Sequence, residues 1–295
     1  MGYRFNRART SAFSKILNRG HHALLLLWEA LKRFDRDHGF FLASGVTFSL
    51  IICLIPLLLL LLAFVGTYLY STKEVLNQIR LSLENIFPAS DPRFMRNILR
   101  VIRDRKIVGI LGLAGLIWTS TWVFSSLRTA LNLIFHVEKG QGVLHGKTVD
   151  LLMILLAGFF LFSSMTLTSV MTYLQGFPLG IKPVIQLILK YLVPFVFTFW
   201  MFFLIYKIVP NRNTPFPAAF QAACFTSVLW EAAKQVFGWY VSHLARFSMV
   251  YGSLSALAVF FLWVYYSSAI LLLGGEIAFL LDGKGKRTIM KMNKT

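Results

Sequence analysis

Four arginines about a third of the way along the chain have the spacing of one helix face. Arg93, Arg96, Arg100 and Arg103 are separated by three, four and three residues, and side chains at these intervals are neighbours on a helix surface. A guanidinium group binds phosphate oxygens through two parallel N–H donors. The pattern therefore predicts a basic amphipathic helix near lipid headgroups. The alternative is a solvated helix face without a ligand.

Charged residues inside long apolar segments form a second candidate site. Glu231 and Lys234 are one helical turn apart, so they can pair and reduce the cost of placing charge in a bilayer, which is at least ~2.5 kcal/mol per group on insertion scales. Three further polar residues lie within such segments: Arg128, Asn132 and Glu276. We interpret this set as a polar path or headgroup site. The alternatives are structural ion pairs and, for Arg128 and Glu276, side chains that extend to a nearby membrane surface.

Patterns typical of catalysis are missing from the sequence. The six histidines form no paired ligand set with an acidic neighbour, and Cys53 and Cys224 both lie in apolar runs, so neither a metal site nor a disulfide is predicted. No Walker A, G-x-S-x-G or G-x-G-x-x-G stretch occurs. We expect no catalytic residue, metal or cofactor, and hence no enzyme. A membrane ribonuclease is a distant alternative.

Long apolar segments must position these residues. Hydrophobic residues make up 57% of the chain and charged residues 14%, against about 45–50% and about 25% in soluble domains. About 20 apolar residues cross the hydrocarbon core, and strand-like alternation is absent. We predict an all-α, polytopic membrane protein with six transmembrane helices and additional amphipathic interfacial helices. The predicted spans are Phe41–Gly66, Ile107–Phe135, Val149–Tyr173, Val184–Val209, Phe216–Val241 and Leu254–Leu281.

The sequence divides into three parts by composition. Residues 1–40 are basic and include apolar residues at helical spacing from Leu24 to Phe34, residues 41–281 form the membrane domain with an amphipathic connection at 67–106, and residues 282–295 are a basic tail. The N-terminal part predicts a helix that lies on the membrane surface or packs as a cytoplasmic helix.

Prolines and glycines mark special positions in the predicted helices. Pro56 removes a backbone hydrogen bond and predicts a kink in the first span. Gly109 and Gly112 lie in one apolar helix, which indicates close packing against a neighbouring helix. Tyr251 precedes the last span, where a tyrosine suits the membrane interface, and Gly252 permits a turn there.

The charge distribution predicts the orientation in the membrane. The formal net charge is +18, and eight Lys or Arg residues lie in the first 40 positions and five in the tail. Six spans place both termini on one side, which the positive-inside rule assigns to the cytoplasm. The connection at 67–106 would face outward although it also carries eight cationic residues. Long connections follow the rule less closely.

Several segments together resemble the YihY/BrkB family of bacterial inner-membrane proteins. They are Gly109–Asn132, Val209–Asn211, Trp230–Tyr240 and Tyr251–Leu281, which begins YGSL, contains Trp263 and carries a Gly-Gly-Glu sequence near its end. The resemblance implies a six-helix inner-membrane fold with cytoplasmic termini and a link to envelope lipid traffic. It also brings a former label as ribonuclease BN that is regarded as mistaken. The first span departs from the family pattern, with Gly45, Thr47 and Phe48 before Pro56 instead of an Ala/Tyr-rich approach.

Together these features predict a transporter-like protein that moves or handles anionic envelope lipids without its own ATPase. The headgroup-binding candidates are Arg93, Arg96, Arg100, Arg103, Arg128, Asn132, Glu231, Lys234, Tyr251 and Glu276. The expected partners are membrane lipids and either a second copy of the chain or another envelope protein, and no nucleic acid is expected. The alternative function is export of a small polar solute, with Glu231 and Lys234 as coupling or substrate groups.

Overall fold

The computed structural model describes residues 25–69, 104–137, 146, 148–150, 152–153, 155–156, 183–244 and 248–282. Several predictions fall outside this part of the chain. They concern the arginine face at 93–103, the rest of the 67–106 connection up to 103, most of the third predicted span and the basic tail at 283–295.

Five long helices contain most of the described residues and confirm the positions of five predicted segments. They are α2 (Gly39–Leu69), α5 (Arg105–Ile134), α7 (Pro183–Ile208), α8 (Phe216–Leu244) and α9 (Ser248–Leu281). A shorter helix at residues 25–36 precedes α2. Because α9 already begins at Ser248, Tyr251 and Gly252 are helical, and the turn that Gly252 would permit does not form there.

Three of these helices contain stretches long and apolar enough to cross a membrane. The stretches are Gly39–Phe64 in α2, Lys106–Ile134 in α5 and Leu257–Leu281 in α9. The apolar stretch of α7 is shorter, at Leu192–Ile208. The described part of the chain is therefore helical with three candidate spans, and the predicted total of six remains a prediction.

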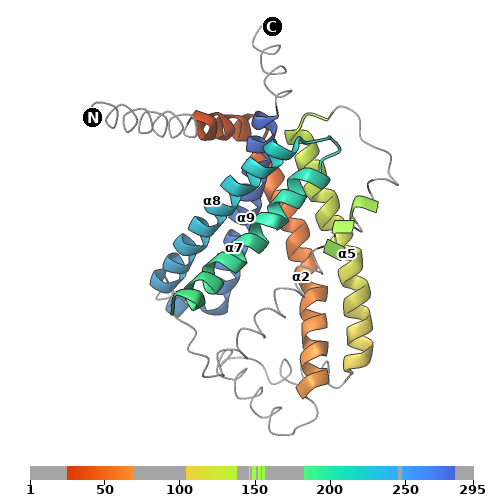
Figure 1. Cartoon of the computed structure of the whole chain (residues 1–295). Coiled ribbons are helices and arrows are strands. Elements are labelled where there is room, and N and C mark those ends of the chain that lie inside the picture. Colours follow the sequence, from red (N-terminus) through yellow and green to blue (C-terminus); the bar gives the residue numbers. More distant parts are fainter. Residues whose placement is uncertain are drawn as a thin grey trace, which may run out of the picture.

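The long helices form two groups that meet at one end of the molecule (Figure 1). In one group α2 lies beside α5, and in the other α7, α8 and α9 pack together. Helix α9 also contacts α2 and α5. The helix at 25–36 lies across the end where α9 finishes and α2 begins, which is the upper end in Figure 1. We call this the charged end of the bundle, for the residues described below.

Glycines of α5 allow close contact with α2, as the sequence predicts. A Cβ atom at Gly112 would lie 3.0 Å from the backbone nitrogen of Leu60, and one at Gly115 would lie 3.1 Å from Cβ of Pro56. Helix α2 continues through Pro56. The two backbones therefore approach each other where the proline interrupts the hydrogen-bond ladder of α2, and a side chain larger than hydrogen would separate them.

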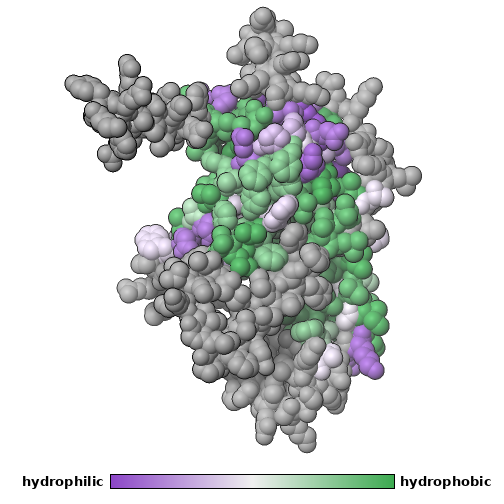
Figure 2. All heavy atoms as spheres, in the orientation of Figure 1, coloured by the Kyte–Doolittle hydropathy of each residue, from purple (hydrophilic) through white to green (hydrophobic). Residues whose placement is uncertain are grey.

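The distribution of side chains between core and surface is that of a protein in lipid. Large apolar residues are exposed along the helices, among them Phe41 at 77%, Ile110 at 70%, and Trp118 and Val236 at 66% each. Figure 2 shows apolar side chains over the body of the molecule and a cap rich in hydrophilic side chains at the charged end. Exposed apolar surface on this scale is unfavourable in water, so these faces fit contact with acyl chains.

Candidate functional site

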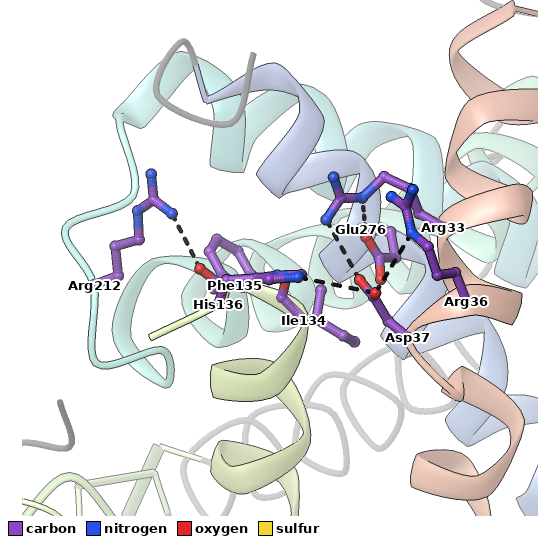
Figure 3. Close-up of polar contacts among 8 residues, drawn as sticks. All are labelled: Arg33, Arg36, Asp37, Ile134, Phe135, His136, Arg212 and Glu276. Atoms are coloured by element: carbon purple, nitrogen blue, oxygen red, sulfur yellow. Dashed lines mark hydrogen bonds and ion pairs between the residues drawn. The ribbon is translucent and has the colours of Figure 1, made fainter. Parts of the chain in front are cut away.

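A cluster of charged side chains occupies the charged end of the bundle (Figure 3). We call it the end cluster. Its members come from the helix at 25–36, the turn before α2, the end of α5, the α7–α8 loop and the end of α9. They are Arg33, Arg36, Asp37, His136, Arg212, Glu276 and Asp282.

Arg33 is the centre of the end cluster. Its Nε donates a hydrogen bond to Glu276 Oε2 at 3.1 Å, and its Nη2 donates to Asp37 Oδ2 at 3.4 Å. Arg33 is 3% exposed and Glu276 is fully buried. The helix at 25–36 buries Arg33 together with Ala30 and Phe34.

One phenylalanine ring lies between two of the arginines. The guanidinium carbon of Arg33 is 4.4 Å and that of Arg212 is 5.3 Å from the centre of the Phe279 ring, which is within the range of cation–π attraction. The imidazole of His136 stacks on the same ring at 5.5 Å. Phe279 therefore lets three groups that carry or can carry positive charge approach one another on an apolar surface.

Acidic groups neutralise the outer part of the end cluster. Asp37 lies 4.0 Å from Arg36 and 3.9 Å from the His136 ring, in addition to Arg33. Arg212 pairs with Asp282 at 2.8 Å and donates to the carbonyl of Phe135 at 3.1 Å. Every charged side chain that the structure describes in the end cluster thus lies near a group of opposite charge. These pairs connect the ends of different helices.

The Gly-Gly-Glu sequence of α9 explains how these elements come together. A Cβ atom at Gly274 would collide with the hydroxyl oxygens of Tyr206 and Thr226, and one at Gly275 would lie 2.7 Å from Leu131. Successive residues of a helix point about 100° apart. Gly274 therefore faces α7 and α8, Gly275 faces α5, and Glu276 faces Arg33.

Tyr206 forms a polar contact inside the membrane domain that the sequence did not reveal. Its hydroxyl lies 3.0 Å from Thr226 Oγ1 and 2.8 Å from the carbonyl oxygen of Leu271, and shares its one hydrogen between these two acceptors. The side chain is completely buried. This contact ties α7 to α8 and α9 at the point where Gly274 leaves room for it.

Arg128 and Asn132 hold the end of α5 to two other segments. Arg128 contacts both carboxylate oxygens of Asp150, at 3.0 and 3.1 Å, and donates to the carbonyl of Gly146. The side-chain oxygen of Asn132 accepts a hydrogen bond from the backbone N–H of Asn211 at 2.8 Å. Both residues have partners within the protein, which agrees with the structural alternative for Arg128 in the sequence analysis.

Replacing Arg128 by lysine should test how much its bidentate contact with Asp150 contributes to the free energy of unfolding. Lysine keeps the charge but not the planar fork, so we expect the free energy of unfolding to fall by about 1–3 kcal/mol, the cost of an unsatisfied buried acceptor. Unfolding in mixed micelles measures it. Lys106→Arg, a change at an exposed basic position of the same helix, is the control. A loss no larger than that of the control would contradict the prediction.

Glu231 and Lys234 form the ion pair that their spacing predicts. Lys234 Nζ lies 2.7 Å from Glu231 Oε2, and each side chain is 33% exposed. The pair lies on α8 and is separate from the end cluster. The side chain of Tyr251 lies outside the described residues, as do Arg93, Arg96, Arg100 and Arg103.

Sequence reasoning missed several residues that the structure brings together. Asp37, Asp150, Arg212 and Asp282 are ordinary charges near segment ends. Asp150 and Arg212 pair with residues 22 and 70 positions away, whereas Asp37 pairs with the nearby Arg33 and Arg36 and with the remote His136. Asp150 carried a usable signal, because it is an acidic residue at the start of a predicted span. Among the described residues, no group of three or more His, Cys, Asp or Glu could hold a metal ion.

Comparisons with known proteins show one family. The family described as Virulence factor BrkB matches residues 30–294 of the chain. This range includes all five long helices and every member of the end cluster, of which Arg33 comes first in the sequence. No solved structure matches the chain.

The curated relatives are membrane proteins of bacteria. A "UPF0761 membrane protein" of Prosthecochloris aestuarii is 29% identical over 85% of this chain and 59% of its own length. One of Glaesserella parasuis is 30% identical over 67% of this chain and 70% of its own length. One of Haemophilus influenzae is 24% identical over 89% of this chain and 96% of its own length. The chain thus spans less than two thirds of the Prosthecochloris relative.

Proposed function

The chain belongs to the BrkB virulence-factor family of membrane proteins, and from this premise we propose that it handles envelope lipids through their anionic headgroup phosphates. In this proposal the protein lies in the bacterial inner membrane with both termini in the cytoplasm. Movement of lipid is passive, coupled to an ion or driven by a partner, because the sequence contains no Walker A motif.

The outward face of the helix at 25–36 is the observation that carries this proposal. Leu25, Trp28 and Leu31 are 51%, 59% and 42% exposed. Two cations accompany these apolar side chains. Lys32 Nζ lies 5.3 Å from the centre of the Trp28 ring, and the side chain of Arg36 is 58% exposed. The free face also carries the exposed acidic residues Glu29 and Asp35. Apolar side chains together with lysine and arginine, at the end of membrane-spanning helices, fit the headgroup region of an anionic leaflet.

The inner face of the same helix fixes its position. Arg33 and Phe34 are buried against the bundle, so the free face is held at the level where α9 ends. The helix thus combines the two interpretations of the sequence, packing on one side and exposure on the other. The charges within the predicted spans support the proposal less, because Arg128 and Glu276 have partners inside the protein.

Lipid movement by the purified protein tests this function. The full chain is reconstituted in vesicles with fluorescent phosphatidylglycerol or phosphatidylethanolamine, and the rate of transfer between leaflets is compared with that of empty vesicles. Each basic residue near an anionic surface contributes about 1 kcal/mol. The double change Lys32→Glu and Arg36→Glu should therefore reduce capture of phosphatidylglycerol at least about thirtyfold.

The neighbouring Glu29→Gln provides the opposite comparison, because Glu29 is exposed on the same helix and its loss makes the face more positive. This variant should capture phosphatidylglycerol at least as well as the wild type. Equal rates with and without the wild-type protein, for both phospholipids, would overturn the proposed function.

A further inference from the structure

Four residues of α8 form a polar stripe that the end cluster does not use. Ser227, Glu231, Lys234 and Gly238 are separated by four, three and four residues, so they lie on one face of the helix. We call this set the α8 stripe. It combines a hydroxyl, an ion pair and a residue without a side chain within an otherwise apolar region.

The α8 stripe lies at the level of the hydrocarbon core. The rings of Trp230 and Phe237 lie 5.7 and 4.4 Å from that of Trp263. Trp263 belongs to the apolar stretch of α9 that is long enough to cross a membrane. Because Glu231 and Lys234 lie between Trp230 and Phe237 in the chain, they occupy the same level.

Each part of the α8 stripe has unused capacity for a ligand. The Ser227 hydroxyl is completely buried and has no hydrogen-bond partner within the described residues. Glu231 and Lys234 keep one third of their surface exposed. A Cβ atom at Gly238 would meet nothing within 4 Å. Exposed charges at this depth are costly beside acyl chains, so this face favours contact with something polar.

We propose that the α8 stripe binds a group that carries an ammonium beside an oxyanion. The ammonium lies at Glu231, the oxyanion lies at Lys234 with Ser227 as a further donor, and Gly238 provides space. An anion alone would take Lys234 from Glu231 and leave a carboxylate unpaired in a region of low dielectric, which is strongly unfavourable. A group with both charges avoids this cost, because its ammonium replaces Lys234 as the partner of Glu231 and its oxyanion replaces Glu231 as the partner of Lys234.

Two sources supply this chemistry, a phospholipid headgroup and a free zwitterionic solute. The lipid source rests on the proposed function and refines it, because it selects among phosphate-bearing headgroups those with an amine. The solute source corresponds to the alternative function in the sequence analysis. The experiment separates the two by using phosphatidylethanolamine for the first and free phosphoethanolamine and glycine for the second.

The test measures binding to the full chain in nanodiscs. Retention of phosphatidylethanolamine and phosphatidylglycerol is measured by native mass spectrometry, and the affinity for phosphoethanolamine and glycine by calorimetry. Glu231→Gln and Lys234→Gln should each weaken binding of the zwitterionic ligands at least tenfold and leave phosphatidylglycerol retention unchanged. Gly238→Leu fills the open space without removing a charge and should weaken binding to a similar extent. It provides a second test if the charge variants fail to fold.

The exposed Gln235 lies beside the stripe, and Gln235→Ala is the matched control that should bind as the wild type does. Enrichment of phosphatidylethanolamine identifies the lipid source, whereas binding of only the soluble ligands identifies the solute source. Unchanged binding of all three zwitterionic ligands in the Gln and Leu variants would overturn the inference, even if the protein moves phospholipids. Absence of lipid movement by the wild type, with binding at the stripe intact, would overturn only the proposed function.

Discussion

Replacing Arg33 by alanine should lower the free energy of unfolding by about 3–5 kcal/mol, the cost of removing one partner of a buried ion pair. The change leaves Glu276 fully buried without the hydrogen bond that Arg33 Nε donates to it. It also removes a contact of Asp37 and the cation above the Phe279 ring. Reversible unfolding in mixed micelles, followed by fluorescence, measures the difference.

Two variants show whether the loss comes from an unpaired charge. Arg36→Ala removes a side chain that is 58% exposed and 4.0 Å from its partner, so it should cost less than about 1 kcal/mol. The double change Arg33→Met and Glu276→Leu replaces the pair by apolar groups and should recover most of the stability. A cost for Arg33→Ala as small as that for Arg36→Ala would show that Glu276 finds another partner.

Replacing Gly274 by alanine should cost about 3 kcal/mol, which combines overpacking with damage to a buried hydrogen bond. The new methyl group would collide with the hydroxyl oxygens of Tyr206 and Thr226. These oxygens are hydrogen-bonded to each other, and the Tyr206 hydroxyl also contacts the Leu271 carbonyl. Relief of the collision requires α7 or α8 to move away from α9. The same unfolding measurement applies.

Two other glycines provide a graded comparison. At Gly275 the new methyl group meets the end of the flexible Leu131 side chain, so the cost should be smaller than at Gly274. At Gly45 nothing lies within 4 Å, and alanine should stabilise the helix by about 0.5–1 kcal/mol. Equal effects at Gly274 and Gly45 would contradict the assignment of Gly274 to a close contact.

These predictions separate structural from ligand-binding charges. The end cluster and the Arg128–Asp150 pair hold helix ends together through groups that are largely buried. The Glu231–Lys234 pair differs, because it is partly exposed and lies beside an unpartnered hydroxyl and an open glycine. Among the described residues, α8 and the free face of the helix at 25–36 are therefore the surfaces on which we expect a ligand.

The helical class and the positions of the five long helices follow from local features of the sequence. Apolar runs such as 41–66 and 107–135 are local features, and a run of this length must form its backbone hydrogen bonds internally if it lies in lipid. The Glu231–Lys234 pair was predictable for the same reason, since one helical turn brings the two residues together whatever surrounds the helix.

Which remote charges meet depends on how the helices pack and could not be predicted from local spacing. Arg33 and Glu276 are 243 residues apart in the chain, and their contact depends on where the helix at 25–36 crosses the end of α9. Glu276 was therefore predicted as a headgroup candidate although it is paired inside the protein. Helix periodicity fixes the direction of a side chain relative to its own helix, whereas its partner depends on how the glycines at 274 and 275 let the neighbouring helices approach.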